Sequence, residues 1–272
     1  ILPASKRRWG GSANGRAPAD TFLRNGSVKG ACEDMPARGR IRATIVKAAA
    51  GQLGQAEPKD HGTFLDEIHK HVTVVKLNEF RLAIFEAMNK EPWLRQAYFS
   101  TARKALETLV SNELVMQRRI NISIQLPDDD SSLLPLHSDV WSGDSPYEVV
   151  LWIPYADCYG TKAMYYTNAA ADARVQPNLK NFKNAEELYQ AVAKDAPFIE
   201  AKYGEVLLFT QNIMHGNRVN TEKETRWSSN CRFKSALSPH ADKKLGQLFA
   251  PISLRPATRL GLRYRLPEGF DK

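Results

Sequence analysis

The sequence is poor in cysteine and contains no long apolar run. Its three cysteines, Cys32, Cys158 and Cys231, are widely spaced and odd in number, so they suggest neither a disulfide framework nor a CxxC-type metal site. No apolar stretch approaches the roughly 20 residues needed to cross a bilayer, and no secretory leader opens the chain. We therefore expect reduced thiols and a soluble, cytoplasmic protein without a membrane partner.

Most of the chain also lacks an excess of either charge. The formal net charge is +8, but residues 1–42 hold nine Lys and Arg against three Asp and Glu, and the other 230 residues hold 29 against 27. An opening rich in Gly, Ala and Arg is typical of a loosely ordered tail. Since no nucleic-acid-binding module accompanies this charge, we expect a poorly ordered basic segment over 1–20 and no nucleic-acid partner.

The hydrophobic pattern changes character near residue 116. Before it, the spacing predicts a short strand, a helix over 40–52, a loop and short helix over 60–74, and longer helices over 76–89 and 93–114. Beyond it, Ile120, Ile122 and Ile124 alternate with polar residues, which indicates a strand with one polar face. Further strands are expected over 148–153, 163–167, 205–210 and 226–234, a helix over 184–194, and loop, a short helix and a tail after 238.

The length of 272 residues fits one well-packed domain with supporting helices. We expect this domain to span 21–272. Within it, we expect helical support at 21–115, an antiparallel core at 116–237 and a C-terminal extension at 238–272.

An HxD pair, His137 and Asp139, is the first candidate for a metal site. On an extended segment, residues two apart point to the same face, so both side chains can bind one ion. His215, which follows the apolar strand expected at 205–210, offers a third ligand. Two imidazoles and one carboxylate leave about three coordination positions open, as in non-haem Fe(II) oxygenases. The same ligands would also accept zinc, so a metal-hydroxide hydrolase is an alternative.

Arg226 raises the case for an oxygenase. It begins a strand on which Ser228, Asn230 and Arg232 share its face. The planar guanidinium matches a carboxylate, and the Ser228 hydroxyl can add a hydrogen bond. Such a pair can hold the distal carboxylate of 2-oxoglutarate while its 2-oxo acid end chelates iron, which argues against the zinc hydrolase. The alternative is a solvated strand arginine.

Four segments carry a family likeness: NEL at 112–114, RINISIQLP at 119–127, HSDVWSGDSP at 137–146 and WIP at 152–154. From about Thr21 to Leu237 the chain resembles the phytanoyl-CoA-hydroxylase-like oxygenases. More narrowly, it is similar to the sporadic carbohydrate cluster oxygenases, a group related to a streptomycin-biosynthesis protein. The resemblance implies a mainly β fold with N-terminal helices, in which the core is a double-stranded β-helix (jelly roll, cupin-like).

The same resemblance implies a function and its residues. The protein is expected to be an Fe(II)- and 2-oxoglutarate-dependent dioxygenase that uses O2 to hydroxylate a sugar or sugar derivative and releases succinate and CO2. His137, Asp139 and His215 match the iron ligands of the family, and Arg226 with Ser228 matches its 2-oxoglutarate clamp. The main alternative is a catalytically silent jelly-roll protein that binds a sugar or a metal. Silent relatives would be expected to lose a ligand or the clamp.

Other polar positions are candidates on weaker grounds. Gln125 and Asn121, on the polar face of the first core strand, could contact 2-oxoglutarate or close a hydrogen-bond network. Substrate contacts are expected from aromatic and polar side chains, which suit a sugar ring. These candidates are Trp141, Asp144, Lys162, Tyr166, Asn217 and Arg232.

Overall fold

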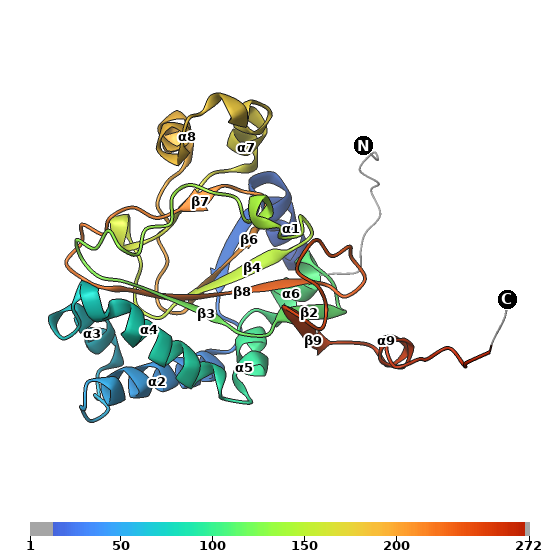
Figure 1. Ribbon diagram of the computed structural model, residues 1–272, viewed down its shortest axis with the longest axis horizontal. Coiled ribbons are helices and arrows are strands. Elements are labelled where there is room, and N and C mark those ends of the chain that lie inside the picture. Colours follow the sequence, from blue (N-terminus) through green and yellow to red (C-terminus); the bar gives the residue numbers. More distant parts are fainter. Residues whose placement is uncertain (1–12, 270–272) are drawn as a thin grey trace.

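A seven-stranded antiparallel sheet lies at the centre of the part of the chain that the computed structural model describes, residues 13–269 (Figure 1). The strand order is β1, β6, β4, β8, β2 and β9, and β3 also pairs with β8. The strands are β1 Ser27–Ala31, β2 Leu114–Gln117, β3 Asn121–Gln125, β4 Val149–Pro154, β6 Glu205–Thr210, β8 Arg226–Ser235 and β9 Phe249–Ser253. A second, two-stranded sheet consists of β5, Tyr165–Tyr166, and β7, His215–Gly216.

Strand β8 is central because it pairs along both edges. It pairs with β4 on one edge and with β3 and then β2 on the other. Trp227 on this strand is fully buried, and its ring meets Phe80 edge-on with centroids 6.3 Å apart. Side chains that alternate with Trp227 point to the opposite face of the strand. They are Arg226, Ser228, Asn230 and Arg232, and all four line one cleft.

Helices lie on two sides of the sheets (Figure 1). On one side, α2, α3, α4 and α5 cover the main sheet, and their apolar side chains join a core with β8. On the other side, α7 and α8 lie beyond β7. The helices are α1 Ala13–Asn25, α2 Met35–Gln52, α3 His61–Asp66, α4 Val74–Asn89, α5 Leu94–Ser100, α6 Arg103–Leu109, α7 Ala169–Val175, α8 Ala185–Val192 and α9 Pro256–Gly261.

Side-chain caps explain where two of these helices begin. Asp34 precedes α2, and its carboxylate accepts the backbone N–H of Ala37 at 2.9 Å. Asn184 precedes α8 and accepts the N–H of Glu187 in the same way. Each bond satisfies one of the N–H groups that a helix start leaves without a partner.

Several elements agree with the sequence pattern and others correct it. The strands expected at 205–210 and 226–234 are confirmed by β6 and β8. The single helix expected over 93–114 is wrong: α5 ends at Ser100, Ala102 has a non-helical backbone, and Leu114 already belongs to β2. Helix α7 lies in a stretch for which the pattern predicted no helix.

Two strands from the ends of the chain join the main sheet. Strand β1 agrees with the short strand expected ahead of the first helix, and β9 lies in the expected C-terminal extension. Helical residues outnumber strand residues, so the architecture is helices plus antiparallel sheet and not mainly β. Residues 13–20 of the expected basic segment belong to α1, and the remainder, 1–12, lies outside the described residues.

The helices and the cysteines of the described residues bear on two expectations from the sequence, the one about membrane spans and the one about disulfides. Within 13–269, no helix is long and apolar enough to cross a bilayer. All three cysteines are free, and Cys158 and Cys231 are buried.

Candidate metal centre and carboxylate clamp

Main-chain hydrogen bonds bring two histidines together. The N–H of His137 donates to the carbonyl of His215 at 3.0 Å, and the N–H of His215 donates to the carbonyl of His137 at 2.8 Å. The centroids of the two imidazoles are 4.4 Å apart. This backbone pairing holds the two histidines next to each other, and their rings lie side by side.

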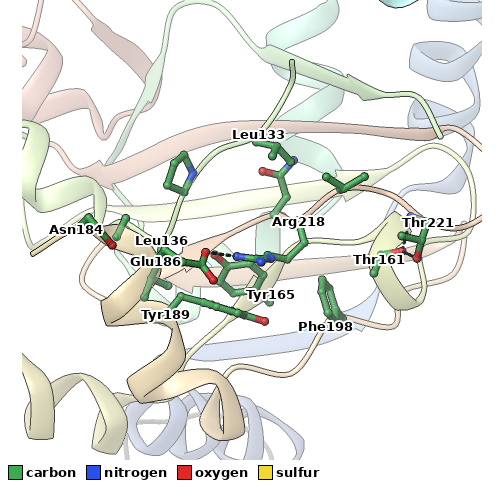
Figure 2. A pocket seen from close by; sticks show the side chains of 14 residues that line it. Leu133, Leu136, Thr161, Tyr165, Asn184, Glu186, Tyr189, Phe198, Arg218 and Thr221 are labelled. Carbon is green, nitrogen blue, oxygen red and sulfur yellow. Dashed lines mark hydrogen bonds and ion pairs between the residues drawn. The ribbon is translucent and has the colours of Figure 1, made fainter. Parts of the chain in front are cut away.

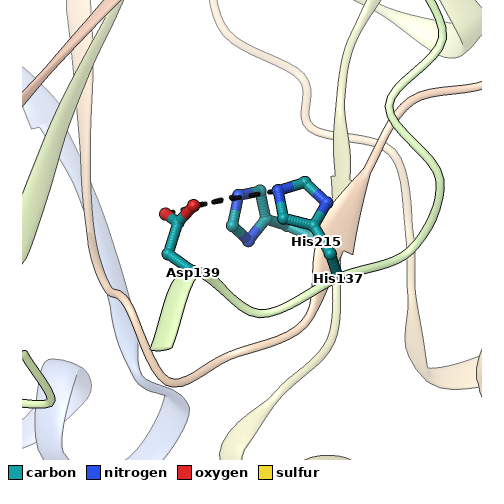
Figure 3. A group of neighbouring side chains, drawn as sticks. All are labelled: His137, Asp139 and His215. Carbon is teal, nitrogen blue, oxygen red and sulfur yellow. Dashed lines mark ion pairs between the residues drawn. The ribbon is translucent and has the colours of Figure 1, made fainter. Parts of the chain in front are cut away.

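Asp139 completes a group of three side chains that could hold a metal ion (Figure 3). Ser138 is extended and Asp139 begins a short 3-10 helix, Asp139–Ser142. Asp139 Oδ1 lies 3.8 Å from His137 Nε2, and Asp139 Oδ2 lies 3.8 Å from His215 Nε2. One ligand atom from each side chain lies within 4.8 Å of the others. Small side-chain rotations would let one ion contact all three at ordinary bond lengths of about 2 Å.

The second nitrogen of each imidazole already has a partner. His137 Nδ1 lies 2.7 Å from the carbonyl oxygen of Pro135, and His215 Nδ1 lies 3.1 Å from that of Ile213. A carbonyl oxygen only accepts, so each Nδ1 carries a proton, and in the neutral form of each ring Nε2 keeps a lone pair for a metal. Burial lowers the pKa of His215 to about 4, so this ring is neutral near pH 7.

Ser138, between the two ligands of the HxD pair, anchors the loop. It is fully buried, and its hydroxyl contacts the carbonyl oxygens of Gln211 at 2.9 Å and Asn212 at 3.1 Å. These carbonyls lie on the turn that leads to His215, so one hydroxyl connects both ligand-bearing segments. The HxD pattern leaves its middle position open, and no sequence signal points to this role.

The three ligands line a cleft of about 280 Å³, here called the metal cleft. One wall is polar and comes from β3 and β8, and another is apolar and comes mainly from β4 and β6. The polar residues are Asn121, Ser123, Asn217, Arg226, Ser228, Asn230 and Arg232, and the apolar ones are Leu134, Val150, Trp152, Met164 and Phe209.

Arg226 is buried in this cleft without a negative partner. Only 4% of it is exposed, and its Nη2 donates to the Ser123 hydroxyl at 3.0 Å. Its Nε–H is buried without a hydrogen-bond acceptor. Burial lowers the pKa of Arg226 to about 10, which still leaves it protonated at neutral pH. Among the described residues, no carboxylate forms an ion pair with it.

This arrangement fits an anionic co-substrate. A buried guanidinium without a counter-ion is costly, and an entering carboxylate would remove that cost through charge-assisted hydrogen bonds. Ser123 and Ser228 are paired across β3 and β8 and lie next to it. The residues present therefore suit a metal ion together with a dicarboxylate such as 2-oxoglutarate.

Arg232 lines the cleft but is engaged by two carboxylates. Its Nη2 lies 3.3 Å from Asp139 Oδ1 and 3.5 Å from Asp144 Oδ2. The Asp144 side chain is fully buried and also pairs with Lys243 at 2.5 Å. The structure thus brings Arg232 and Asp144 close to the metal ligands, but Asp144 lies behind Arg232 and does not line the cleft.

Of the two co-substrate candidates on β3, only Asn121 lines the metal cleft. Its side chain donates to Asn230 Oδ1 at 3.0 Å. Gln125 is fully buried beside Arg226 in the strand register, and its amide donates to the carbonyl of Arg218 at 2.7 Å. Ser123, between them, contacts Arg226 directly. The alternating pattern of this strand could have identified Ser123, because it shares their polar face.

Lys162 does not line the metal cleft, so its expected contact with substrate finds no support there. Its side chain is fully buried and pairs with Asp66 at 2.6 Å and with Glu224 at 2.7 Å. Two carboxylates on neighbouring segments compensate the buried charge of this side chain, which comes from the short 3-10 helix Gly160–Lys162. Trp141 and Tyr166 also lie outside the lining of the cleft, and Trp141 is 43% exposed.

A larger pocket of about 700 Å³, here called the outer pocket, lies beside residues 133–136, the loop that precedes His137 (Figure 2). Tyr165, Tyr189 and Phe198 line it, and Arg218 pairs there with Glu186 of α8 at 2.5 Å. Asn217 lines both cavities, but its amide is held by the backbone of Leu134 and Ser132. The outer pocket contains none of the three metal ligands.

Comparison with known proteins supports the fold. No family model matches the sequence, and no curated protein is similar to it at a significant level. A non-heme alpha ketoglutarate dependent carbocyclase, SnoK from nogalamycin biosynthesis, is similar in structure with a TM-score of 0.54 and 12% identity, over 88% of this chain and 96% of its own. A non-heme monooxygenase, ThoJ in its apo form, has a TM-score of 0.51 and 13% identity, over 87% and 84%.

The chain has a fold that non-haem oxygenases use. At 12% and 13% identity the likeness shows the fold alone, and it agrees with the helix-plus-sheet architecture described above. The narrower likeness to carbohydrate-cluster oxygenases stays a prediction.

Proposed function

We propose that this protein is an Fe(II)- and 2-oxoglutarate-dependent oxygenase that acts on a small molecule. The observation that carries the proposal is the pairing of two features in one cleft of 280 Å³. One is the group of His137, Asp139 and His215, which suits a non-haem iron. The other is Arg226, a buried cation without an acidic partner in the described chain.

Different residues would bind the metal and the co-substrate. His137, Asp139 and His215 would hold the metal through two Nε2 atoms and one carboxylate oxygen. Arg226, with Ser123 and Ser228 beside it, would hold the distal carboxylate of 2-oxoglutarate. Bound iron would supply the oxidation chemistry, in which O2 and 2-oxoglutarate give succinate, CO2 and an oxidised substrate.

The apolar residues that line the cleft would keep water away from the metal. Val150, Trp152 and Phe209 are each at most 4% exposed. They lie beside the polar residues of β8 on the same sheet face, with Val150 paired to Arg232 and Trp152 to Asn230, and would exclude water from that part of the cleft. Because position 139 is a carboxylate and not Gly or Ala, no ligand position is left for a halide, and we expect oxygen transfer and not halogenation.

The finer parts of the proposal are the barrel and the substrate. We propose that the two sheets form a double-stranded β-helix around the cleft, since His137 pairs with β7 and faces β8 across it. We also propose a sugar or sugar derivative as substrate, in keeping with the carbohydrate-cluster resemblance and with the amide and hydroxyl groups of Asn121, Ser228 and Asn230.

Succinate formation tests this proposal. The wild-type protein is supplied with Fe(II), O2 and 2-oxoglutarate, and sugars, sugar phosphates, amino acids and fatty acyl thioesters are added one at a time. We expect sugars to stimulate succinate formation, a product heavier by one oxygen, and loss of both in His215→Ala. Stimulation by a different class would reject the sugar assignment. Ligand binding without any succinate would favour the silent binding protein.

A further inference from the structure

A third cavity, here called the chamber, shares part of its lining with the metal cleft. It has a volume of about 560 Å³ and lies between α4, the loop 131–134 and β3. Four residues line both the chamber and the metal cleft: Asn121, Ser123, Leu134 and Asn230. Among the described strands, β3 pairs only with β8, so its other edge is left for the chamber. The two spaces therefore meet along β3.

The outer pocket shares only Asn217 with the lining of the metal cleft. Between it and the metal cleft, the chain on either side of His137 and His215 is joined by hydrogen bonds, including the His137–His215 pair and the bond from Asn217 N–H to the Leu134 carbonyl at 3.0 Å. The one residue that lines both spaces, Asn217, has its amide committed to this wall. The chamber shares four lining residues with the metal cleft and the outer pocket shares one, so the chamber is the better placed of the two to hold the body of a substrate.

Size also requires a second space. The metal cleft, at about 280 Å³, falls just below the roughly 300–1,000 Å³ that is typical of ligand pockets. 2-Oxoglutarate itself would fill much of it. A substrate of ordinary size would thus place only its reacting carbon at the metal, and the rest would lie in the chamber.

The chamber has a distinct chemistry. Its polar lining consists of amides and hydroxyls, including Asn78, Asn121 and Asn230, together with one cation, Arg81. None of the described residues that line it is acidic. Arg81 donates to Asn78 Oδ1 at 2.8 Å and forms no ion pair within the described chain. By contrast, Arg232 is held by two carboxylates, and Arg226 is needed for the co-substrate.

We propose that the chamber binds the body of the substrate, a hydroxyl-rich molecule with one anionic group, and that Arg81 receives this group. The proposal rests on the function proposed above and extends it. The amides of Asn121 and Asn230 meet hydroxyls near the metal, and Arg81, at the α4 side of the chamber, fixes the orientation of the substrate. The anion is a phosphate or a carboxylate, which Arg81 recognises through the same hydrogen bonds.

Two variants and two matched controls test the chamber. Arg81→Gln removes the cation, and Lys76→Gln removes a cation from the same helix outside the chamber. Asn78→Trp fills the chamber, and Ala185→Trp fills the outer pocket in the same way. The probes are glucose 6-phosphate and glucuronate, with glucose as the neutral match. The readouts are probe-stimulated succinate formation and the affinities for Mn(II) and 2-oxoglutarate.

We expect the two anionic probes to stimulate turnover more than glucose does. Arg81→Gln should raise their KM on the order of tenfold to a hundredfold, the loss expected for a charge-assisted hydrogen bond, and should leave the response to glucose unchanged. Asn78→Trp should abolish stimulation. Both controls should behave as wild type, and all four variants should keep wild-type affinities for Mn(II) and 2-oxoglutarate.

Other outcomes overturn the proposal. An unchanged KM in Arg81→Gln removes the anion contact, and a block by Ala185→Trp but not by Asn78→Trp moves the substrate to the outer pocket. Absence of stimulation by all three probes rejects the substrate class. Failure of the proposed oxygenase function is separate, because it would appear as a wild-type protein that does not bind 2-oxoglutarate when loaded with Mn(II).

Discussion

At the scale of single residues, the histidines are prepared for a metal by bonds on their far side. Both Nδ1 atoms face a carbonyl two residues earlier in the chain, Pro135 for His137 and Ile213 for His215. Such contacts fix the ring orientation and the tautomer of metal-binding histidines.

Removal of any one ligand tests this site. His137→Ala, Asp139→Ala and His215→Ala should each lower Mn(II) or Fe(II) affinity on the order of a hundredfold or more, since losing a ligand should exceed the 10–100-fold typical of losing its outer partner. Calorimetric titration measures the affinity. His71→Ala, at an exposed histidine outside the cleft, is the control. Undiminished affinity in all three variants would refute the assignment.

At the scale of elements, the close approach of β7 to the loop before His137 requires a glycine. A methyl group at Gly216 would lie 2.6 Å from Tyr165 Oη and 2.7 Å from the carbonyl oxygen of Leu134. Both distances are shorter than real side-chain carbons show, and one involves rigid backbone. The neighbouring residue is His215, so any shift of β7 would move a metal ligand.

Gly216→Ala should therefore be damaging in two ways. We expect the free energy of unfolding to fall by about 1–3 kcal/mol, as for an overpacked core, and Mn(II) affinity to fall as well. Gly30→Ala on β1 is the matched control, because a methyl group there meets no atom within 4 Å. Denaturant unfolding and calorimetry give both quantities. Equal stability of the two variants would show that the β7 contact is loose.

A buried lysine connects elements at the start of β8. Lys162 pairs with Asp66 at the end of α3 and with Glu224, two residues before Arg226. Burial lowers the pKa of Lys162, but its hydrogen bonds to these carboxylates outweigh burial and raise the pKa above 10.5. Burial raises the pKa of Asp66, whereas the bond to Lys162 lowers that of Glu224. Burial destabilises the charged form of Asp66 more than that of Glu224. Both carboxylates stabilise the protonated form of Lys162.

The two ion pairs of Lys162 predict that the free energy of unfolding depends on pH. A raised pKa means that the stabilisation is fully present below the ordinary value of 10.5 and is lost as the pH rises through the folded value. Lys162→Met should lower the free energy of unfolding by about 1–3 kcal/mol at pH 8, because it leaves two carboxylates without their cation, partly screened by solvent. In urea unfolding, the difference in the free energy of unfolding between wild type and Lys162→Met should shrink above pH 10.5. A gap that stays constant to pH 12 would contradict this account.

At the scale of the whole molecule, local patterns predicted the ligands better than the surroundings. The HxD pair, the histidine after the apolar strand and the arginine that begins β8 each have a local sequence signal, and the structure brings all four side chains into one cleft. Lys162 looked equally polar in the sequence, but its partners lie 96 and 62 residues away. The pairing of β9 with β2 could not be predicted from the sequence for the same reason, because these two strands lie far apart along the chain.

The most direct test of the central claim is the binding of 2-oxoglutarate, measured by calorimetry in three proteins. Wild type loaded with Mn(II) should bind it tightly, and metal-free wild type should bind it weakly. Arg226→Gln loaded with Mn(II) should bind it on the order of a hundredfold more weakly while keeping its Mn(II) affinity, and Arg218→Gln should match wild type. Equal 2-oxoglutarate affinity in Arg226→Gln, or binding that does not depend on the metal, would contradict the account.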